Sequence, residues 1–215
     1  MKTKYTPVSY PSTEEKLNVL THGLGLILSF IGLYLLLIKA GYMTKTTHKI
    51  SLVIYGLSLI ILYSASTFYH ASKEPEKRRK LNIFDHASIY ILIAGSYTPF
   101  ALITLEGKTG WWLLGIIWSI ALAGVILKLF YTGKFEKLST IVYVIMGWIA
   151  VFAMKPLIEN LDREGLYWLI AGGLFYTIGA IFYSSSKLKY NHAIFHVFVL
   201  LGSLSQFIAI YKYVH

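Results

Sequence analysis

Seven long apolar stretches dominate this 215-residue sequence. They cover approximately residues 19–40, 50–70, 84–104, 111–131, 138–158, 166–185 and 192–211. Each has the length of roughly 20 residues that a helix needs to cross a hydrocarbon core about 30 Å thick. The stretches do not alternate apolar and polar residues, as the strands of a membrane barrel do. The sequence therefore predicts an all-α integral membrane protein, a seven-transmembrane helix bundle.

The distribution of charge agrees with a membrane protein. Only 14% of the residues are charged, whereas 56% are hydrophobic, and the charges gather in short segments between the apolar stretches. The net charge of +10 comes from loops rather than from one basic patch, so anionic lipid headgroups are the expected partner and nucleic acid is not. The sequence has no cysteine, which excludes disulfides and thiolate metal sites.

The chain is expected to form one compact helical unit, because the connections are short. Residues 1–18 are predicted to be a cytoplasmic segment with a short interfacial helix, and residues 19–215 the transmembrane domain. Ser12 and Glu15 fit a capping box at the start of that short helix. Pro99 and Pro156 are expected to kink or end their helices locally.

Lysine and arginine counts predict the orientation in the membrane. With the N-terminus in the cytoplasm, 13 of the 20 basic residues lie on the cytoplasmic side and 7 on the other. Basic residues favour cytoplasmic loops. The sequence therefore predicts a cytoplasmic N-terminus and a C-terminus outside.

Several polar residues fall at one depth of this predicted bundle. Ser66 and His70 end the second stretch on the N-terminal side, Asp85 begins the third there, and His192 and His196 begin the seventh. Residues four apart share a helix face, so His192 and His196 point the same way, as do Ser66 and His70. Buried ionisable residues in a membrane bundle are unfavourable unless they pair or bind something.

A metal ion is the most economical single explanation of this cluster. Two imidazoles on one face can bind one metal, and a third from another helix leaves a coordination position for water, which zinc acidifies. Asp85 is the only acidic residue in the predicted spans, and it could orient that water or accept its proton.

Each residue also has a simpler interpretation. The His192 and His196 spacing could be coincidence or serve interhelical hydrogen bonds. His70 could lie at the lipid interface, Asp85 could cap the third helix, and Ser66 could bond back to its own helix. His86 follows Asp85 by about 100° of helical rotation and is expected to face elsewhere.

The motifs of the chain resemble those of a known family. They are "EEKLNVLTH" (Glu15, Asn18, His22), "SASTFYH" (Ser66, His70), "FDHASIY" (Asp85) and "NHAIFH" (His192, His196). From Glu15 to His196 the chain is similar to bacterial hemolysin III proteins. These belong to the progestin and adipoQ receptor group, within a superfamily of seven-span membrane hydrolases that includes alkaline ceramidases.

The resemblance implies a zinc ion near the cytoplasmic side, held by His70, His192 and His196. It places Asp85 at the metal through a water molecule and Ser66 beside the site, and it implies a multi-pass protein of the bacterial plasma membrane. His22, in its "THG" context, could support the site or could cap the bundle through hydrogen bonds with Asn18 or Glu15, and the structural role is favoured.

Three functions are compatible with these features. The first is a zinc-dependent intramembrane hydrolase of a lipid amide or ester that serves membrane lipid homeostasis, with Asp85 and Ser66 as catalytic residues. The second is a non-catalytic sensor or receptor with structural zinc and a lipid or fatty-acid ligand. The third is a hemolysin-like lytic protein, which the seven long spans disfavour because most pore-formers are released as soluble chains.

Overall fold

The computed structural model describes residues 5–185 and 187–215, and seven helical segments in it are long and apolar enough to cross a membrane. They are α1 (Ser12–Gly41), α2 (Thr46–Ala71), α3 (Pro75–Pro99) with a π-helical extension (Phe100–Thr104), α4 (Gly107–Tyr131), α5 (Glu136–Gly147) with α6 (Met154–Asn160), α7 (Arg163–Ser184), and α8 (Asn191–Ile208) with a π-helical extension (Ala209–Tyr213). The all-α, seven-span prediction is confirmed. Every predicted range lies within an observed span, apart from residue 185, which follows the end of α7.

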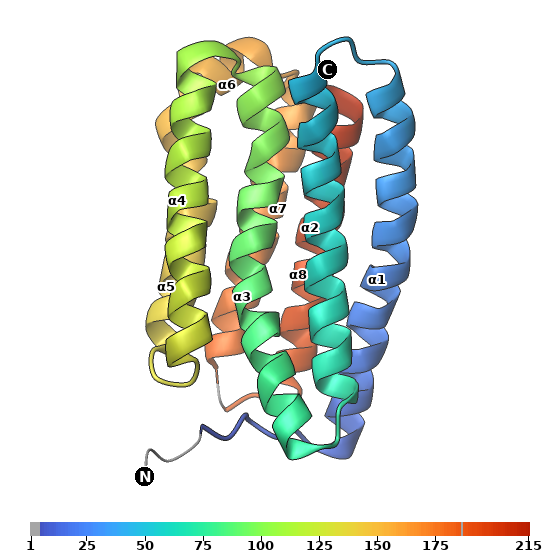
Figure 1. Ribbon diagram of the computed structural model, residues 1–215, viewed down its shortest axis with the longest axis vertical. Helices are drawn as coiled ribbons and strands as arrows, with labels where there is room; N and C mark the ends of the chain where they lie inside the picture. Colours follow the sequence, from blue (N-terminus) through green and yellow to red (C-terminus); the bar gives the residue numbers. More distant parts are fainter. Residues whose placement is uncertain (1–4, 186) are drawn as a thin grey trace.

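The spans stand side by side, with the two chain ends at opposite ends of the bundle (Figure 1). Helix α1 contacts α2 and α8, and α3 contacts both α2 and α4, whereas α5 makes fewer contacts with its neighbours α3 and α7. We call the end that carries the N-terminus the N-terminal end of the bundle. The charge count predicts that this end is cytoplasmic, and two of the counted residues, Lys2 and Lys4, lie outside the described residues.

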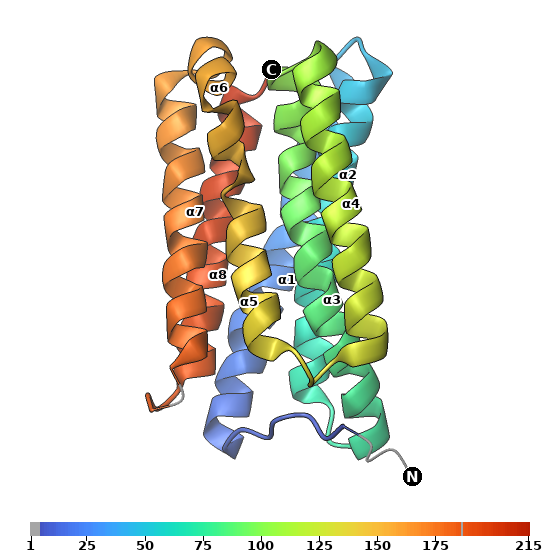
Figure 2. The ribbon, with the colours of Figure 1, turned by 90° about the vertical axis from the view of Figure 1, so that its left-hand side faces the viewer.

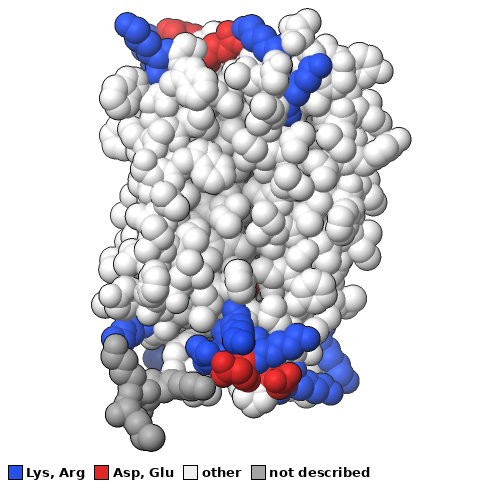
Figure 3. All heavy atoms as spheres, viewed as in Figure 1, with Lys and Arg blue, Asp and Glu red and all other residues white. Residues whose placement is uncertain are grey.

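The outer surface of the bundle is apolar between two charged ends. Figure 3 shows basic and acidic side chains at both ends of the molecule and a wide uncharged band between them. Large apolar side chains point outward in this band, among them Ile27 and Phe30 of α1 and Leu122 of α4. Helices suit such an environment because all of their backbone hydrogen bonds are internal. The chain is therefore a multi-pass membrane protein.

Helix α1 begins at the predicted residue but without the predicted capping box. Pro11 occupies the N-cap position and no side chain caps the helix. Proline has neither a hydroxyl nor an amide hydrogen, so the reciprocal bonds of the box cannot form there. The Glu15 carboxylate accepts the amide hydrogen of Tyr10 at 3.3 Å and contacts His70 and Arg78 instead. From Ser12 to Gly41 the helix is continuous.

Both prolines accompany local departures from the α-helix. Helix α3 ends at Pro99 and continues as a π-helix, while Pro156 lies in the first turn of α6, after a 3₁₀ segment (Ile149–Ala153) that breaks the fifth span. The Tyr97 hydroxyl lies 2.8 Å from the carbonyl oxygen of Gly147 and 2.9 Å from the amide nitrogen of Ala150. It therefore satisfies backbone groups that the break leaves unpaired.

Close packing of α4 against the π-helical extension predicts a stability effect at Gly110. A Cβ atom at this position would overlap the backbone carbonyl oxygen of Ala101, which cannot move aside as a flexible side chain could. We expect Gly110→Ala to destabilise the protein by about 1–3 kcal/mol, measured as a lower thermal unfolding midpoint in detergent. Gly115→Ala in the same helix is the control, because a Cβ there meets nothing within 4 Å. Equal midpoints for the two variants would contradict the prediction.

Candidate metal centre

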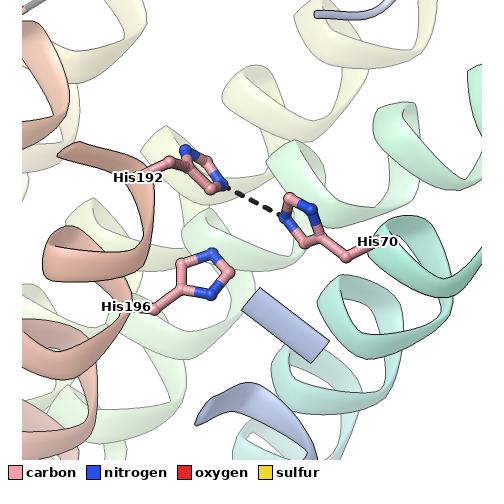
Figure 4. Close-up of side chains that lie close together, drawn as sticks. All are labelled: His70, His192 and His196. Carbon is pink, nitrogen blue, oxygen red and sulfur yellow. Dashed lines mark hydrogen bonds between the residues drawn. The ribbon is translucent and has the colours of Figure 1, made fainter. Parts of the chain in front are cut away.

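Three buried histidines meet at the N-terminal end of the bundle. His70 lies in the last turn of α2, and His192 and His196 lie one turn apart at the start of α8. Their rings point toward one another (Figure 4), and one nitrogen of each lies within 4.8 Å of the others. All three are at most 4% exposed. The structure thus brings together the three predicted ligands in a group that could bind a metal.

The Nδ1 atom of each ring lies near an oxygen acceptor. The His70 Nδ1 is 2.7 Å from the Glu15 carboxylate, the His192 Nδ1 is 3.0 Å from the Tyr10 hydroxyl, and the His196 Nδ1 is 3.3 Å from the Thr21 hydroxyl. Because a carboxylate only accepts, the Nδ1 of His70 carries its hydrogen. When the Nδ1 hydrogen of a ring is donated to such an oxygen, the Nε2 lone pair is free to bind a metal. Histidines that bind metals usually have an acceptor of this kind at the other ring nitrogen.

The separation of two Nε2 atoms fits a metal between them. The Nε2 atoms of His70 and His192 are 3.1 Å apart. If neither nitrogen carries a hydrogen, two lone pairs face each other in a buried site, which is unfavourable without a cation. Two ligand nitrogens of a tetrahedral zinc, each about 2.0–2.1 Å from the metal, lie about 3.3 Å apart. The donor set and its spacing therefore fit Zn²⁺.

Asp85 and Ser66 lie beside this group. Both are buried, and they line a cavity together with His192 and His196. Asp85 is in the third turn of α3, which begins at Pro75, so it does not cap the helix as its simpler interpretation required. Among residues 5–185 and 187–215, the Ser66 hydroxyl makes no hydrogen bond to a carbonyl of its own helix, so it does not bond back either. Their catalytic roles remain predictions.

A family model described as "Haemolysin-III related" matches residues 10–207. The chain belongs to this family. Its resemblance to hemolysin III proteins is therefore confirmed. Hemolysin-3 of Bacillus cereus is 45% identical over 214 residues, which cover 100% of this chain and 98% of the relative. The Hemolysin-3 homolog of Bacillus subtilis (strain 168) is 42% identical over 200 residues, or 93% of this chain and 94% of the relative.

A more distant relative extends the family beyond bacteria. Monocyte to macrophage differentiation factor of Homo sapiens is 29% identical over 218 residues, which cover 99% of this chain and 88% of the relative. This relative is a member of the progestin and adipoQ receptor group. Members of the haemolysin-III related family thus match this chain across all seven spans.

In this haemolysin-III related chain, His22 does not make its expected hydrogen bonds. Its ring stacks on His196 with the centroids 3.5 Å apart and the planes 8° apart, and it meets the edge of Tyr63. Neither ring nitrogen has a hydrogen-bond partner in the described part of the chain. The expected partners Asn18 and Glu15 contact His70 instead. His22 therefore packs directly against a candidate ligand.

A second polar cluster lies on the α5 side of the same cavity. The His86 Nε2 is 3.3 Å from the Glu136 carboxylate, which also pairs with the buried Lys128 at 3.2 Å. As expected, His86 takes no part in the three-histidine group. Glu136 was not identified from the sequence, because it follows a loop and shares no helix with His86. Tyr10 and Thr21, the partners of two candidate ligands, were missed as well.

Proposed function

We propose that this protein is a zinc-dependent hydrolase of a lipid amide or ester, and that it serves membrane lipid homeostasis in the bacterial plasma membrane. One observation supports the proposal above the others. A buried group of three histidines, with Asp85 and Ser66 beside it, lies at one end of a cavity inside the bundle. Buried ionisable groups in a membrane bundle mark functional sites.

The cavity has the character expected of a site for an acyl chain. It encloses about 170 Å³, far more than the roughly 10–15 Å³ that one water molecule needs. Its polar end is lined by His192, His196 and Asp85, and beyond them its walls are largely apolar. Side chains from several spans form these walls, including Ile93, Phe100, Val144, Val151, Leu169 and Val199. A lipid could therefore place its carbonyl near the histidines and its chain among the apolar residues.

The reaction we propose is addition of water to an acyl carbonyl. Zn²⁺ bound by three imidazoles supplies Lewis acidity, which polarises a carbonyl and promotes loss of a proton from water. Asp85 accepts the proton of the attacking water while the water oxygen bonds to the acyl carbon. Ser66 donates a hydrogen bond to the carbonyl oxygen as negative charge develops there. When the bond from the acyl carbon to the amide nitrogen or ester oxygen breaks, Asp85 returns the proton to the leaving group. The other product is a fatty acid.

The proposal is tested with the purified protein in detergent. We expect about one zinc ion per chain, and release of fatty acid from a panel of acyl amides and esters that stops when a chelator removes the metal. Metal content is measured by elemental mass spectrometry and fatty acid by chromatography. Stoichiometric zinc without any release would contradict a hydrolase and support the alternative of a sensor with structural zinc.

The names of the bacterial relatives support one other candidate function. Two proteins that are 45% and 42% identical to this chain are called Hemolysin-3 and Hemolysin-3 homolog. A lytic protein should release a dye from liposomes in proportion to the amount of protein added. A hydrolase that does not form pores should leave liposomes of a non-substrate lipid intact.

A further inference from the structure

The residues before α1 lie across the N-terminal end of the bundle. We call residues 5–11 the N-terminal strap, and Figure 2 shows it running beneath the helices from the start of α1 toward the start of α3. Two side chains hold it there. The Tyr69 hydroxyl donates to the Val8 carbonyl at 3.2 Å, and the Arg78 guanidinium donates to the same carbonyl at 3.3 Å. The strap therefore has a defined position over the candidate metal centre.

One residue of the strap contacts a candidate ligand directly. The Tyr10 ring stacks on His192, with the ring centroids 4.5 Å apart and the planes 27° apart. Its hydroxyl oxygen lies 3.0 Å from the His192 Nδ1. Tyr10 thus contacts His192 both through the face of its ring and through its hydroxyl.

We propose that Tyr10 is a positioning residue of the metal centre. Its hydroxyl oxygen accepts the Nδ1 hydrogen of His192, which fixes the ring orientation and the tautomer whose Nε2 can bind the metal. The inference rests on the metal centre of the proposed function and not on hydrolysis.

The three Nδ1 partners differ in how firmly the fold holds them. Glu15 and Thr21 lie within α1, which is continuous from Ser12. Tyr10 lies in the strap, outside any helix, and is held there by its amide bond to Glu15 and by the two bonds to the neighbouring Val8. The orientation of His192 therefore depends on the strap being in place.

The test compares Tyr10→Phe with Tyr5→Phe. The first variant keeps the stacked ring and removes only the hydroxyl at His192. The second makes the same change in the same strap, at a residue whose ring packs against Gly133 in the loop between α4 and α5. Zinc affinity is measured by competition with a chromophoric chelator, and cobalt replaces zinc to give a visible spectrum of the ligand geometry.

We expect Tyr10→Phe to bind zinc about 10- to 100-fold more weakly, the usual effect of removing a second partner of a metal ligand. Its cobalt spectrum should shift, while the thermal midpoint of the metal-free protein should stay within about 2 °C of wild type. Tyr5→Phe should match wild type in all three measurements.

The possible failures are distinguishable. If wild type and Tyr10→Phe bind zinc equally well with the same cobalt spectrum, the role of Tyr10 is wrong and the metal centre stands. If both tyrosine variants lose zinc affinity equally, zinc binding depends on the strap in general, and the specific role of Tyr10 is wrong. If the wild type binds no metal, the metal centre fails and the role of Tyr10 fails with it.

Discussion

Replacing His196 by alanine should lower zinc affinity at least 100-fold. Structural zinc sites with four protein ligands bind with about 10–16 kcal/mol, so each ligand accounts for about 3 kcal/mol, and each 1.4 kcal/mol is a factor of ten. His196 is 1% exposed and lies between His192 and His22, so a water molecule from bulk solvent cannot readily replace its ring. The measurement is zinc content after gel filtration, together with the competition constant.

The matched control for this variant is His48→Ala. His48 lies at the opposite end of α2 from His70, where it contacts Glu106 in the loop that precedes α4. This variant should retain one zinc ion per chain. Full zinc binding by His196→Ala, with a correctly folded protein, would show that the three histidines do not form the metal centre.

Replacing Asp85 by asparagine should lower fatty-acid release by a factor of about 100 to 10,000 while zinc content stays the same. A general acid or base contributes an effect of this size. Asparagine keeps the shape of the buried side chain but cannot accept and return a proton at neutral pH. Asp85 also lies outside the three-histidine group, so its loss should not remove a direct ligand.

Asp162→Asn provides the control for the aspartate. Asp162 is the N-cap of α7, at the other end of the bundle from the histidines, and its replacement should leave both release and zinc content unchanged. Unchanged turnover in Asp85→Asn would show that Asp85 is not the base. Loss of zinc in the same variant would instead assign it a role in holding the metal.

The sequence predicts the helices, and the meeting of the three histidines, for identifiable reasons. A lipid bilayer requires spans of nearly fixed length, so uninterrupted apolar stretches give the position of each helix. With seven spans, the alternation of direction places His70 and His192 at the same end. Helical spacing then puts His196 on the same face as His192.

Other features depend on tertiary contacts that no periodic pattern reveals. Tyr10 precedes the first span and reaches His192, which is 182 residues further along the chain. Glu136 meets His86 only because α5 packs against α3. Glu15 was predicted to form a capping box with Ser12, but in the folded protein its carboxylate accepts the amide hydrogen of Tyr10 and also bonds to His70, a long-range contact that the local pattern does not reveal.

In the proposed metal centre, the distribution of the three histidines over the chain would link metal supply to folding. His70 belongs to the second span and the other two to the last, so an unfolded chain has no preformed site. A metal that binds only the folded chain, present at a free concentration 100 times its dissociation constant, adds about 2.7 kcal/mol to the free energy of unfolding. Zinc starvation should therefore expose the protein to proteolytic turnover, and its steady-state abundance should follow the metal available to the cell.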